Sequence, residues 1–546
     1  MRHKGVCDMY LDTMELPKKN KLMEAYRHDP QFFHTFFDYE VTQAGYENRA
    51  EELQGRSFQR QQLAVAIEHY MEPFGISDLA AQHIQELSND ALVVIGGQQA
   101  GILTGPLYSV HKAISVILLA KEQRKALNKP VIPVFWIAGE DHDINEINHT
   151  YTAKAGKAAK RQFKQPTILK TMASDTPYDQ KEMAAFIRKV FKSYGETTYT
   201  RGLLDHVLQT VKQQQTFTGF FTSLMNDLFT KHGLLFMDAA YKPLRQLESP
   251  YFSQMIESSE AMARSIYATE QQLQSHGYSK PIESEESDAN IFYVHDTGRI
   301  LLRRKDGKFV NEQSGISFTE QKMYELAKNE PWLLSNNVAT RPIMQDLVFP
   351  VLAFVGGPGE IAYWSLLKDA FHIMGIHMPV IVPRLSITLV NRQVQEALEL
   401  TDITMAQVMD YQLPEHQEQW LEQQRDEPFD RLLDETKSQL EAQYEKLHTH
   451  LETTDPSLLQ LLQKNLQFHK SQFDYLQKKK EQSILVKHHV QYERYHVISE
   501  QLFPEGSLQE RLYSPYFYMN QFGEDLIDEL LKQSYTFDGS HQLVYL

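Results

Sequence analysis

The chain has 546 residues, of which 42% are hydrophobic and 23% charged, and its formal net charge is −16. This length exceeds what one compact core usually holds, so two to four structural units are expected. The acidic balance argues against a general nucleic-acid binder, and the single cysteine, Cys7, excludes a disulfide framework and a thiolate zinc site.

The first part of the chain is predicted to be helical. Residues 1–5 precede mixed polar sequence without the apolar stretch of a signal peptide, so a cytoplasmic protein is expected. Residues 1–90 then have the pattern of helices interrupted at Pro30 and Pro73.

Five apolar runs follow and predict buried strands at 92–96, 131–137, 234–238, 347–355 and 378–382. Four of them lack alternation of polar and apolar residues, which is typical of strands covered by helices on both faces. Residues 107–127 have the apolar spacing of a helix. Strands separated by helical stretches predict an α/β fold with a Rossmann-like parallel sheet and right-handed crossovers.

Two intervals between these strands are too long for simple crossovers and predict insertions. The first is Lys-rich with a helical pattern, and the second contains an antiparallel meander near residues 291–310. We expect the following organisation: N-terminal helices and the first half of the core in 1–137, an insertion in 138–232, a core strand in 233–240, a second insertion in 241–345, the second half of the core in 346–395, a helical hairpin in 396–505, and a C-terminal segment in 506–546 that returns to the core.

The hairpin is predicted from heptad spacing. Leu433, Leu440 and Leu447 recur at intervals of seven, and after Pro456 the apolar positions alternate at three and four. Two helices of roughly 35–45 residues would form a long antiparallel coiled coil. We expect this coiled coil to join two copies of the chain as a homodimer. No run of eighteen apolar residues occurs, so no membrane span is expected.

A glycine-rich turn follows the first predicted strand and precedes the helix at 107–127. Glycines let the backbone approach a ligand, and the start of a helix attracts anions. The spacing matches neither the dinucleotide fingerprint nor the Walker loop. A tight turn without a ligand is the alternative. The candidates for binding a nucleotide or another anion here are Gly96, Gly97, Gln98, Gln99, Gly101, Thr104 and Gly105 in the turn, and His111 and Lys112 on the helix.

A cluster of ionisable residues follows the second predicted strand. Glu140, Asp141, His142 and Asp143 are consecutive, and three carboxylates so close together repel one another unless a cation or donor compensates. They are the predicted catalytic group, together with His111. The cluster could bind a metal, act as a general base or hold an ammonium group. At helical spacing, His142 would share one face with Glu146 and His149. The alternative is a charged start of a helix.

A second glycine loop follows the fourth predicted strand, so the two halves of the sheet are expected to face each other across one crevice. Cations and amides near the late strands could hold a carboxylate. The substrate-binding candidates are Gly356, Gly357, Gly359, Glu360, Tyr363, Asn336, Arg341 and Arg384.

Three of these stretches resemble one known family. The run from Gly96 to Lys112, the motif from Phe135 to Asp143 with residues 146–149, and the run from Val355 to Trp364 are similar to the bacillithiol biosynthesis cysteine-adding enzymes. The similarity covers the whole chain, including the helical hairpin.

The resemblance implies a Rossmann-like core with connecting-peptide insertions and a coiled coil that pairs two subunits. It also implies a ligase that adds L-cysteine to glucosaminyl-malate, through an amide to the glucosamine amine, as the last step of bacillithiol synthesis. Activation of the carboxylate would use ATP, with ATP or ADP as the bound nucleotide and Mg²⁺ as its accompanying ion.

A more distant resemblance concerns the run from Thr104 to His111, which looks like the ATP-binding motif of class I aminoacyl-tRNA synthetases. Tyr108 and Val110 depart from that motif, and the second synthetase loop is absent, with only Arg384 to Ser386 as a partial match. Cysteine-selecting enzymes of that class hold the thiol on zinc through cysteines. This chain lacks them, so zinc is not expected.

Two other functions are compatible with the residues alone. One is a metal-dependent hydrolase or deacetylase that uses His142, Asp143, Glu146 and His149. The other is a non-catalytic coiled-coil scaffold with a nucleotide-binding fold that has lost its activity.

Overall fold

The computed structural model describes residues 9–17, 20–154, 157–165, 171–296 and 298–546. It divides into two compact units. The first covers the described residues up to Lys154, then Ala158–Val390 and Ser507–Leu546, and the second is formed mainly by Asn391–Gly506. Among the described residues, no helix combines the length and apolar character needed to cross a membrane.

A five-stranded parallel sheet is the centre of the first unit. Its spatial order is β13-β12-β2-β3-β6, and every neighbouring pair is parallel. Along the chain, β3 and β6 are added on one side of β2, and β12 and β13 are then added on its other side. The strand order therefore reverses between β2 and β12. The strands are β2 (Leu92–Gln98), β3 (Val131–Ile137), β6 (Leu235–Asp238), β12 (Val351–Gly356) and β13 (Val380–Pro383).

The five predicted strands and the predicted helix at 107–127 are confirmed, with one boundary corrected. The expected strand at 347–355 begins only at Val351, because Leu347 and Val348 belong to α13 (Thr340–Val348). Pro350 disfavours a helical conformation for Phe349, which is extended and ends the helix.

Helices cover the sheet. The helix α6 (Leu107–Leu127) packs on β2 and β3, α3 (Gln43–Gln54) packs on β12 and β13, and α4 (Arg60–Met71) packs on β6. The other N-terminal helices are α1 (Lys21–His28), α2 (Pro30–Phe36) and α5 (Asp78–Asn89).

A small sheet brings the two ends of the chain together. β15 (His541–Tyr545) lies between β1 (Tyr10–Met14) and β14 (Ser386–Val390), antiparallel to β1 and parallel to β14. The expectation that residues 1–90 are helical is therefore wrong at β1. This strand is stabilised by pairing with residues more than 500 positions away, which local pattern does not reveal.

The first insertion contains the two-stranded β4 (His149–Lys154) and β5 (Lys157–Gln162), followed by helices. The helices are the single turn α7 (Ile144–Ile147) before β4, and then α8 (Gln180–Tyr194), α9 (Thr200–Gln213) and α10 (Phe217–Phe229).

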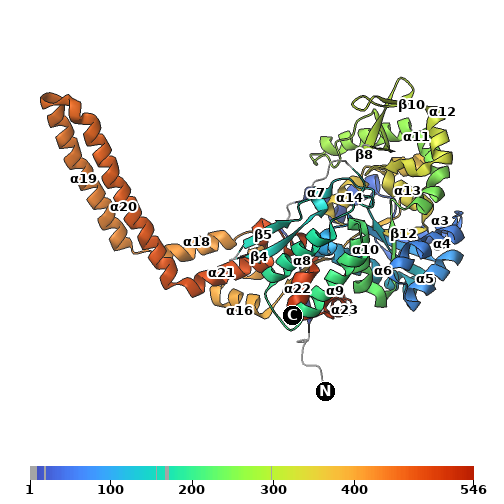
Figure 1. The fold of residues 1–546 in the computed structure, drawn as a ribbon, viewed down its shortest axis with the longest axis horizontal. Coiled ribbons are helices and arrows are strands. Elements are labelled where there is room, and N and C mark those ends of the chain that lie inside the picture. The colour runs from blue at the N-terminus through green and yellow to red at the C-terminus, as the bar shows by residue number, and fades with distance from the viewer. Residues whose placement is uncertain (1–8, 18–19, 155–156, 166–170, 297) are drawn as a thin grey trace, which may run out of the picture. The chain divides into compact units, whose positions relative to one another are not determined.

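The second insertion contains the predicted meander, extended by two more strands into a five-stranded antiparallel sheet. Figure 1 shows it gathered with α11 (Lys242–Ser275) and α12 (Glu320–Asn329) in one lobe, in green to yellow. Its strands are β7 (Asp288–His295), β8 (Gly298–Lys305), β9 (Lys308–Asn311), β10 (Ile316–Thr319) and β11 (Leu334–Asn336).

The remaining helices of the first unit follow the late strands of the main sheet. They are α14 (Pro358–Trp364) and α15 (Lys368–Ile373) between β12 and β13, and α22 (Pro515–Phe522) and α23 (Leu526–Leu530) in the C-terminal segment.

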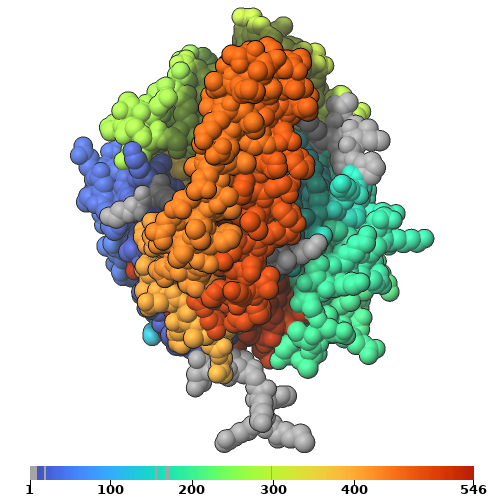
Figure 2. All heavy atoms as spheres, turned by 90° about the vertical axis from the view of Figure 1, so that its left-hand side faces the viewer, coloured from blue at the N-terminus to red at the C-terminus, as the bar shows by residue number. Residues whose placement is uncertain are grey.

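The second unit contains the predicted helical hairpin. Its helices α19 (Glu427–Thr454) and α20 (Leu459–Lys487) lie side by side in both views (Figures 1 and 2). Ion pairs from Lys437 to Asp474 and from Lys480 to Asp426, at 3.0 and 2.7 Å, fix their antiparallel register. The unit also holds α16 (Arg392–Thr401), α17 (Met405–Met409), α18 (Leu413–Gln423) and α21 (His489–Leu502).

The two hairpin helices have 28 and 29 residues, which is shorter than expected. Asp426 caps the start of α19, with Pro428 in its first turn, and α20 ends at a break before His489. The expected length had merged these helices with their neighbours in the chain.

Gly97 tests the packing of the central sheet. A Cβ atom at Gly97 would lie 2.5 Å from the carbonyl oxygen of Trp136 on the neighbouring strand. Because backbone in a sheet cannot move aside easily, we expect Gly97→Ala to destabilise the first unit by about 1–3 kcal/mol. Thermal unfolding measures this as a lowered midpoint. Gly359→Ala is the control, since no atom lies within 4 Å of its Cβ position. Equal midpoints for the two variants would contradict the packing.

Candidate active site

A cavity of about 730 Å³ opens at the carboxyl ends of the parallel strands, beside the point where the strand order reverses. Ligands of open α/β sheets bind at this position. The walls come from the ends of β2 and β3, from the loop after β12, and from β7, β8 and β11 of the second insertion. The volume suits a small polar molecule with a cosubstrate.

Most of the site residues predicted from the sequence lie together around this cavity. Those that line it are Gly97, Gln98, Gln99, Lys112, Glu140, Asp141, His142, Asn336, Arg341, Gly357, Gly359, Glu360, Tyr363 and Arg384. Gly101 and Gly105 line a smaller hollow of about 320 Å³, which shares Gln99, Tyr108 and Arg511 with the larger cavity. Gly96, Thr104, His111, Asp143 and Gly356 line neither space.

Lys112 joins the two glycine loops. Its buried ammonium donates to the carbonyl of Gly97 at 2.6 Å, to Oε1 of Gln98 at 3.1 Å and to the carboxylate of Glu360. Burial lowers the pKa of Lys112, while the Glu360 carboxylate opposes that shift. Glu360 also accepts from the backbone N–H of Gly357 at 2.8 Å. The expectation that the two halves of the sheet face each other is confirmed.

The two loops use their glycines differently. In the first loop, a Cβ at Gly101 would lie 2.7 Å from the Cα of Gly105, so these glycines allow two stretches of backbone to touch. In the second loop, no atom lies within 3.4 Å of a Cβ at Gly357 or within 4 Å of one at Gly359. The second loop therefore presents its backbone to the cavity, whereas the first is packed on itself.

The start of α6 is not fully available to an anion. The N–H of Leu107 donates to the carbonyl of Tyr513 at 2.8 Å, so the C-terminal segment already satisfies one of the first N–H groups of this helix. The start of α6 therefore offers fewer N–H groups to an anion than the sequence analysis assumed.

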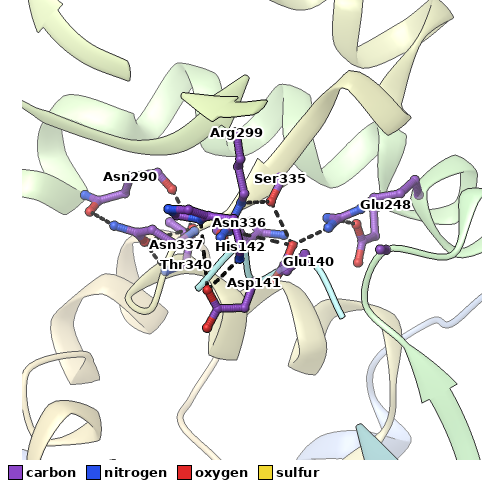
Figure 3. A network of polar contacts seen from close by, with 12 residues as sticks. Glu140, Asp141, His142, Glu248, Asn290, Arg299, Ser335, Asn336, Asn337 and Thr340 are labelled. Atoms are coloured by element: carbon purple, nitrogen blue, oxygen red, sulfur yellow. Dashed lines mark hydrogen bonds and ion pairs between the residues drawn. The ribbon is translucent and has the colours of Figure 1, made fainter. Parts of the chain in front are cut away.

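Glu140 lies in the cavity wall, where it is buried in an ion-pair network (Figure 3). It accepts from Arg245, and from the hydroxyl of Ser335 at 2.8 Å, and Arg299 lies 3.9 Å away. Burial raises the pKa of Glu140, but the two arginines and these hydrogen bonds outweigh it and bring the pKa below its ordinary value. A carboxylate held in this way positions its neighbours and is a poor proton acceptor.

Asp141 and His142 are more open to the cavity. Asp141 accepts from the amide of Gln99 at 2.5 Å and from the backbone N–H of His142 at 2.7 Å, which fixes the turn. The Nδ1 atom of His142 lies 3.9 Å from Oδ1 of Asp141. At this distance the carboxylate does not hydrogen-bond to the imidazole, but it lies close enough to stabilise a protonated His142.

Asp143 has a local structural role. Its side chain accepts from the N–H of Asn145 at 3.1 Å and caps α7. For this residue the structure therefore matches the alternative interpretation, a charged residue at the start of a helix. Because α7 ends at Ile147 and His149 begins β4, the expected helical face of His142, Glu146 and His149 does not form. No group of three His, Cys, Asp or Glu side chains within the described ranges is arranged to hold a metal ion.

His111 and Arg384 converge on Glu510, a residue that the sequence did not identify. The Nδ1 atom of His111 lies 2.9 Å from the Glu510 carboxylate, and Arg384 donates two hydrogen bonds to it at 2.9 and 2.7 Å. Burial raises the pKa of Glu510, but Arg384 and His111 overcome this effect and hold the pKa well below its ordinary value. Burial also lowers the pKa of His111.

Arg341, like Arg511, differs from the other cations of the cavity. It donates to the hydroxyl of Tyr363 at 2.6 Å, and no carboxylate in the described part of the chain pairs with it. Arg299 and Arg303, in contrast, have acidic neighbours. Burial raises the pKa of the Tyr363 hydroxyl to about 12, so this hydroxyl stays protonated beside Arg341.

The sequence identified Asn336 and Arg341 in the second insertion but not the other residues that this insertion contributes. Asn290, Phe292 and Arg299 line the cavity from β7 and β8, and Arg245 reaches Glu140 from α11. The predicted meander indicated where these strands lie but not which of their side chains face the crevice.

The parallel sheet with its cavity at the reversal point defines an enzyme of the Rossmann-like α/β class. The model of the bacillithiol biosynthesis BshC N-terminal Rossmann-like domain matches residues 9–385, and that of the BshC C-terminal coiled-coil domain matches residues 387–546. The chain therefore belongs to the BshC family of bacillithiol biosynthesis.

Curated relatives match over nearly the full length. A protein of Lysinibacillus sphaericus (strain C3-41) is 44% identical over 98% of this chain and all of its own. One of Geobacillus sp. (strain WCH70) is 38% identical over 91% of this chain and 92% of its own. One of Bacillus cereus (strain ATCC 10987 / NRS 248) is 34% identical over 98% of this chain and all of its own. Each carries the name "Putative cysteine ligase BshC".

Glu510 provides a test of the buried network. Removing its charge by Glu510→Gln leaves the Arg384 guanidinium buried without a carboxylate, which costs about 3–5 kcal/mol. We expect a clearly lowered midpoint of thermal unfolding. Glu524→Gln is the matched control, because Glu524 is exposed. If Glu510→Gln unfolds at the same temperature as this control, the network does not stabilise the unit.

Proposed function

We propose that this protein joins L-cysteine to glucosaminyl-malate, forming an amide between the cysteine carboxyl group and the glucosamine amine, as the last step of bacillithiol synthesis. Membership in the BshC family and the cysteine ligase name of the relatives support the reaction class. The observation that carries the assignment is that one cavity holds both Arg341, a cation without a carboxylate partner among the described residues, and a candidate general base, His142, with Asp141 beside it.

The malyl group fits the side of the cavity formed by the second glycine loop. Malate carries two carboxylates, and a guanidinium without an acidic partner offers two parallel donors to one of them. The open backbone at Gly357 and Gly359 adds room for close approach. Arg341 and this loop are therefore the proposed carboxylate site.

Proton transfer falls to His142 with Asp141 beside it. The glucosamine amine attacks the cysteine carbonyl carbon, the C–N bond forms, the bond to the activating group breaks, and the amine gives up one proton. His142 accepts that proton in the proposed mechanism. Glu140 keeps its structural role, because Arg245 and Arg299 hold its charge.

Activation of a carboxylate needs an energy source, and ATP with Mg²⁺ is the proposed one. The donor set fits an anion: Arg511 lies on the wall shared by the two hollows, and no carboxylate in the described ranges pairs with it. Lys112 lines the same cavity, but its three donors already serve Gly97, Gln98 and Glu360, so Arg511 is the proposed phosphate contact. The described residues offer no three-ligand metal site, so oxygen ligands of Mg²⁺ would come from phosphates and water. This absence also gives the hydrolase alternative no geometric support.

The direct test is mass spectrometry of the protein incubated with glucosaminyl-malate, cysteine and Mg-ATP. The expected result is the thiol product together with AMP or ADP. Folded protein that yields no product with these three substrates would contradict the proposal.

The same assay distinguishes catalytic from structural residues in the acidic cluster. We expect His142→Gln to lower kcat by about 100- to 10,000-fold, the usual contribution of a general base. Asp143→Asn is the neighbouring control and should retain the rate, because an asparagine caps a helix as well as an aspartate. Equal rates for His142→Gln and the unchanged protein would remove His142 from the mechanism.

We also propose that the protein is a cytoplasmic homodimer joined through the coiled coil. Leu461, Phe468 and Tyr475 on α20 are 63%, 64% and 57% exposed and recur at intervals of seven. Heptad-spaced apolar residues that α19 does not cover suit a second copy of the same hairpin.

Light scattering coupled to gel filtration tests the dimer. The double change Leu461→Glu with Phe468→Glu should convert the dimer to a monomer, because it puts charges into the apolar stripe. Gln463→Glu, an exposed position on the opposite face of the same helix, should remain dimeric. A dimer that survives the double change would show that subunits do not meet at this stripe.

A further inference from the structure

The side chain of Asn290 lines the cavity from the second insertion. It lies on β7, and its residue is 4% exposed. Its backbone has φ 56°, a conformation that asparagine tolerates better than most residues. The hydroxyl of Thr340 donates to its carbonyl at 2.7 Å and fixes the backbone in place.

A chain of hydrogen bonds determines which way the Asn290 amide points (Figure 3). Oδ1 of Asn337 accepts from the N–H groups of Ala339 and Thr340 at 2.9 and 3.0 Å, so its Nδ2 must face the other way. That Nδ2 donates to Oδ1 of Asn290 at 2.8 Å. The donor of Asn290, Nδ2, therefore remains, and it has no partner among the described residues.

An acceptor accompanies this donor. Asn336 lies on β11, and its backbone is paired with Ile291, the residue next to Asn290. It is 2% exposed and lines the same cavity, and its Oδ1 has no partner in the described part of the chain. Buried polar atoms are rarely left unpaired, because each costs free energy. Two neighbouring ones in one cavity wall point to a ligand.

We infer that Asn290 and Asn336 recognise the hydroxyl groups of the glucosamine ring. A hydroxyl donates one hydrogen bond and accepts others, which matches one amide donor beside one amide acceptor. The carboxylates belong with the charged Arg341. The sugar then binds under β7 while the malyl group faces the second glycine loop. This inference rests on the proposed function and adds how the substrate is oriented.

Calorimetric titration of the full-length protein with two probes tests it. Glucosaminyl-malate carries the sugar and malate does not. The variant Asn290→Asp replaces the Nδ2 donor with an oxygen and keeps the Oδ1 acceptor that Asn337 needs. It also adds a negative charge, so its effect is compared with that of an uncharged variant at Asn336. We expect its Kd for glucosaminyl-malate to rise by about 5- to 100-fold, the effect of leaving a buried group unpaired, and its Kd for malate to stay unchanged.

Two further variants make the result specific. Asn336→Leu removes the acceptor without adding charge and should give the same selective loss. Asn20→Asp makes the same chemical change as the first variant at an exposed helix cap, and both affinities should remain as in the unchanged protein. Thermal unfolding confirms that each variant is folded.

Equal weakening of both probes in the two cavity variants, or no weakening of glucosaminyl-malate, would overturn the inference while leaving the ligase proposal intact. If the unchanged protein binds no glucosaminyl-malate and forms no product, the proposed function fails, and the inference fails with it.

Discussion

The ammonium group of Lys112 lies between the two halves of the parallel sheet, and it is the contact on which the candidate site depends. A buried charge is costly unless it is paired and hydrogen-bonded. Lys112 meets this requirement with the carbonyl of Gly97 on one side and the carboxylate of Glu360 on the other. Lys112 therefore holds the two glycine loops at a fixed distance from each other, and the cavity lies between them.

A second buried charge connects the far end of the chain to the same centre. Glu510 accepts from Arg384 and lies against His111, so residues from three distant parts of the sequence share one carboxylate. The C-terminal strand β15 completes a small sheet beside it. The C-terminal segment thus completes the Rossmann-like core.

The parts of this structure that follow from local pattern could be predicted, and the parts that depend on distant pairing could not. Buried strands such as 131–137 are visible as apolar runs, and the order of strands explains why residues after β2, β3 and β12 meet. Gln99 and Asp141 lie together for this reason.

The remaining features depend on pairs of residues far apart in the sequence. Nothing near Glu140 shows that Arg245, 105 residues later, neutralises it, and the sequence therefore offered it as a catalytic residue. Asn290 gave no signal because its role depends on the fixed orientation of Asn337. His111 was predicted from a motif, but its partner lies 399 residues away.

The central claim is that the cavity between the two glycine loops is where glucosaminyl-malate binds and reacts. A crystal structure of the protein with bound glucosaminyl-malate tests this claim most directly. The account predicts a malyl carboxylate against Arg341 and the glucosamine amine within hydrogen-bonding reach of His142. Ligand density at another place on the protein, or a molecule bound with its amine away from His142, would contradict it.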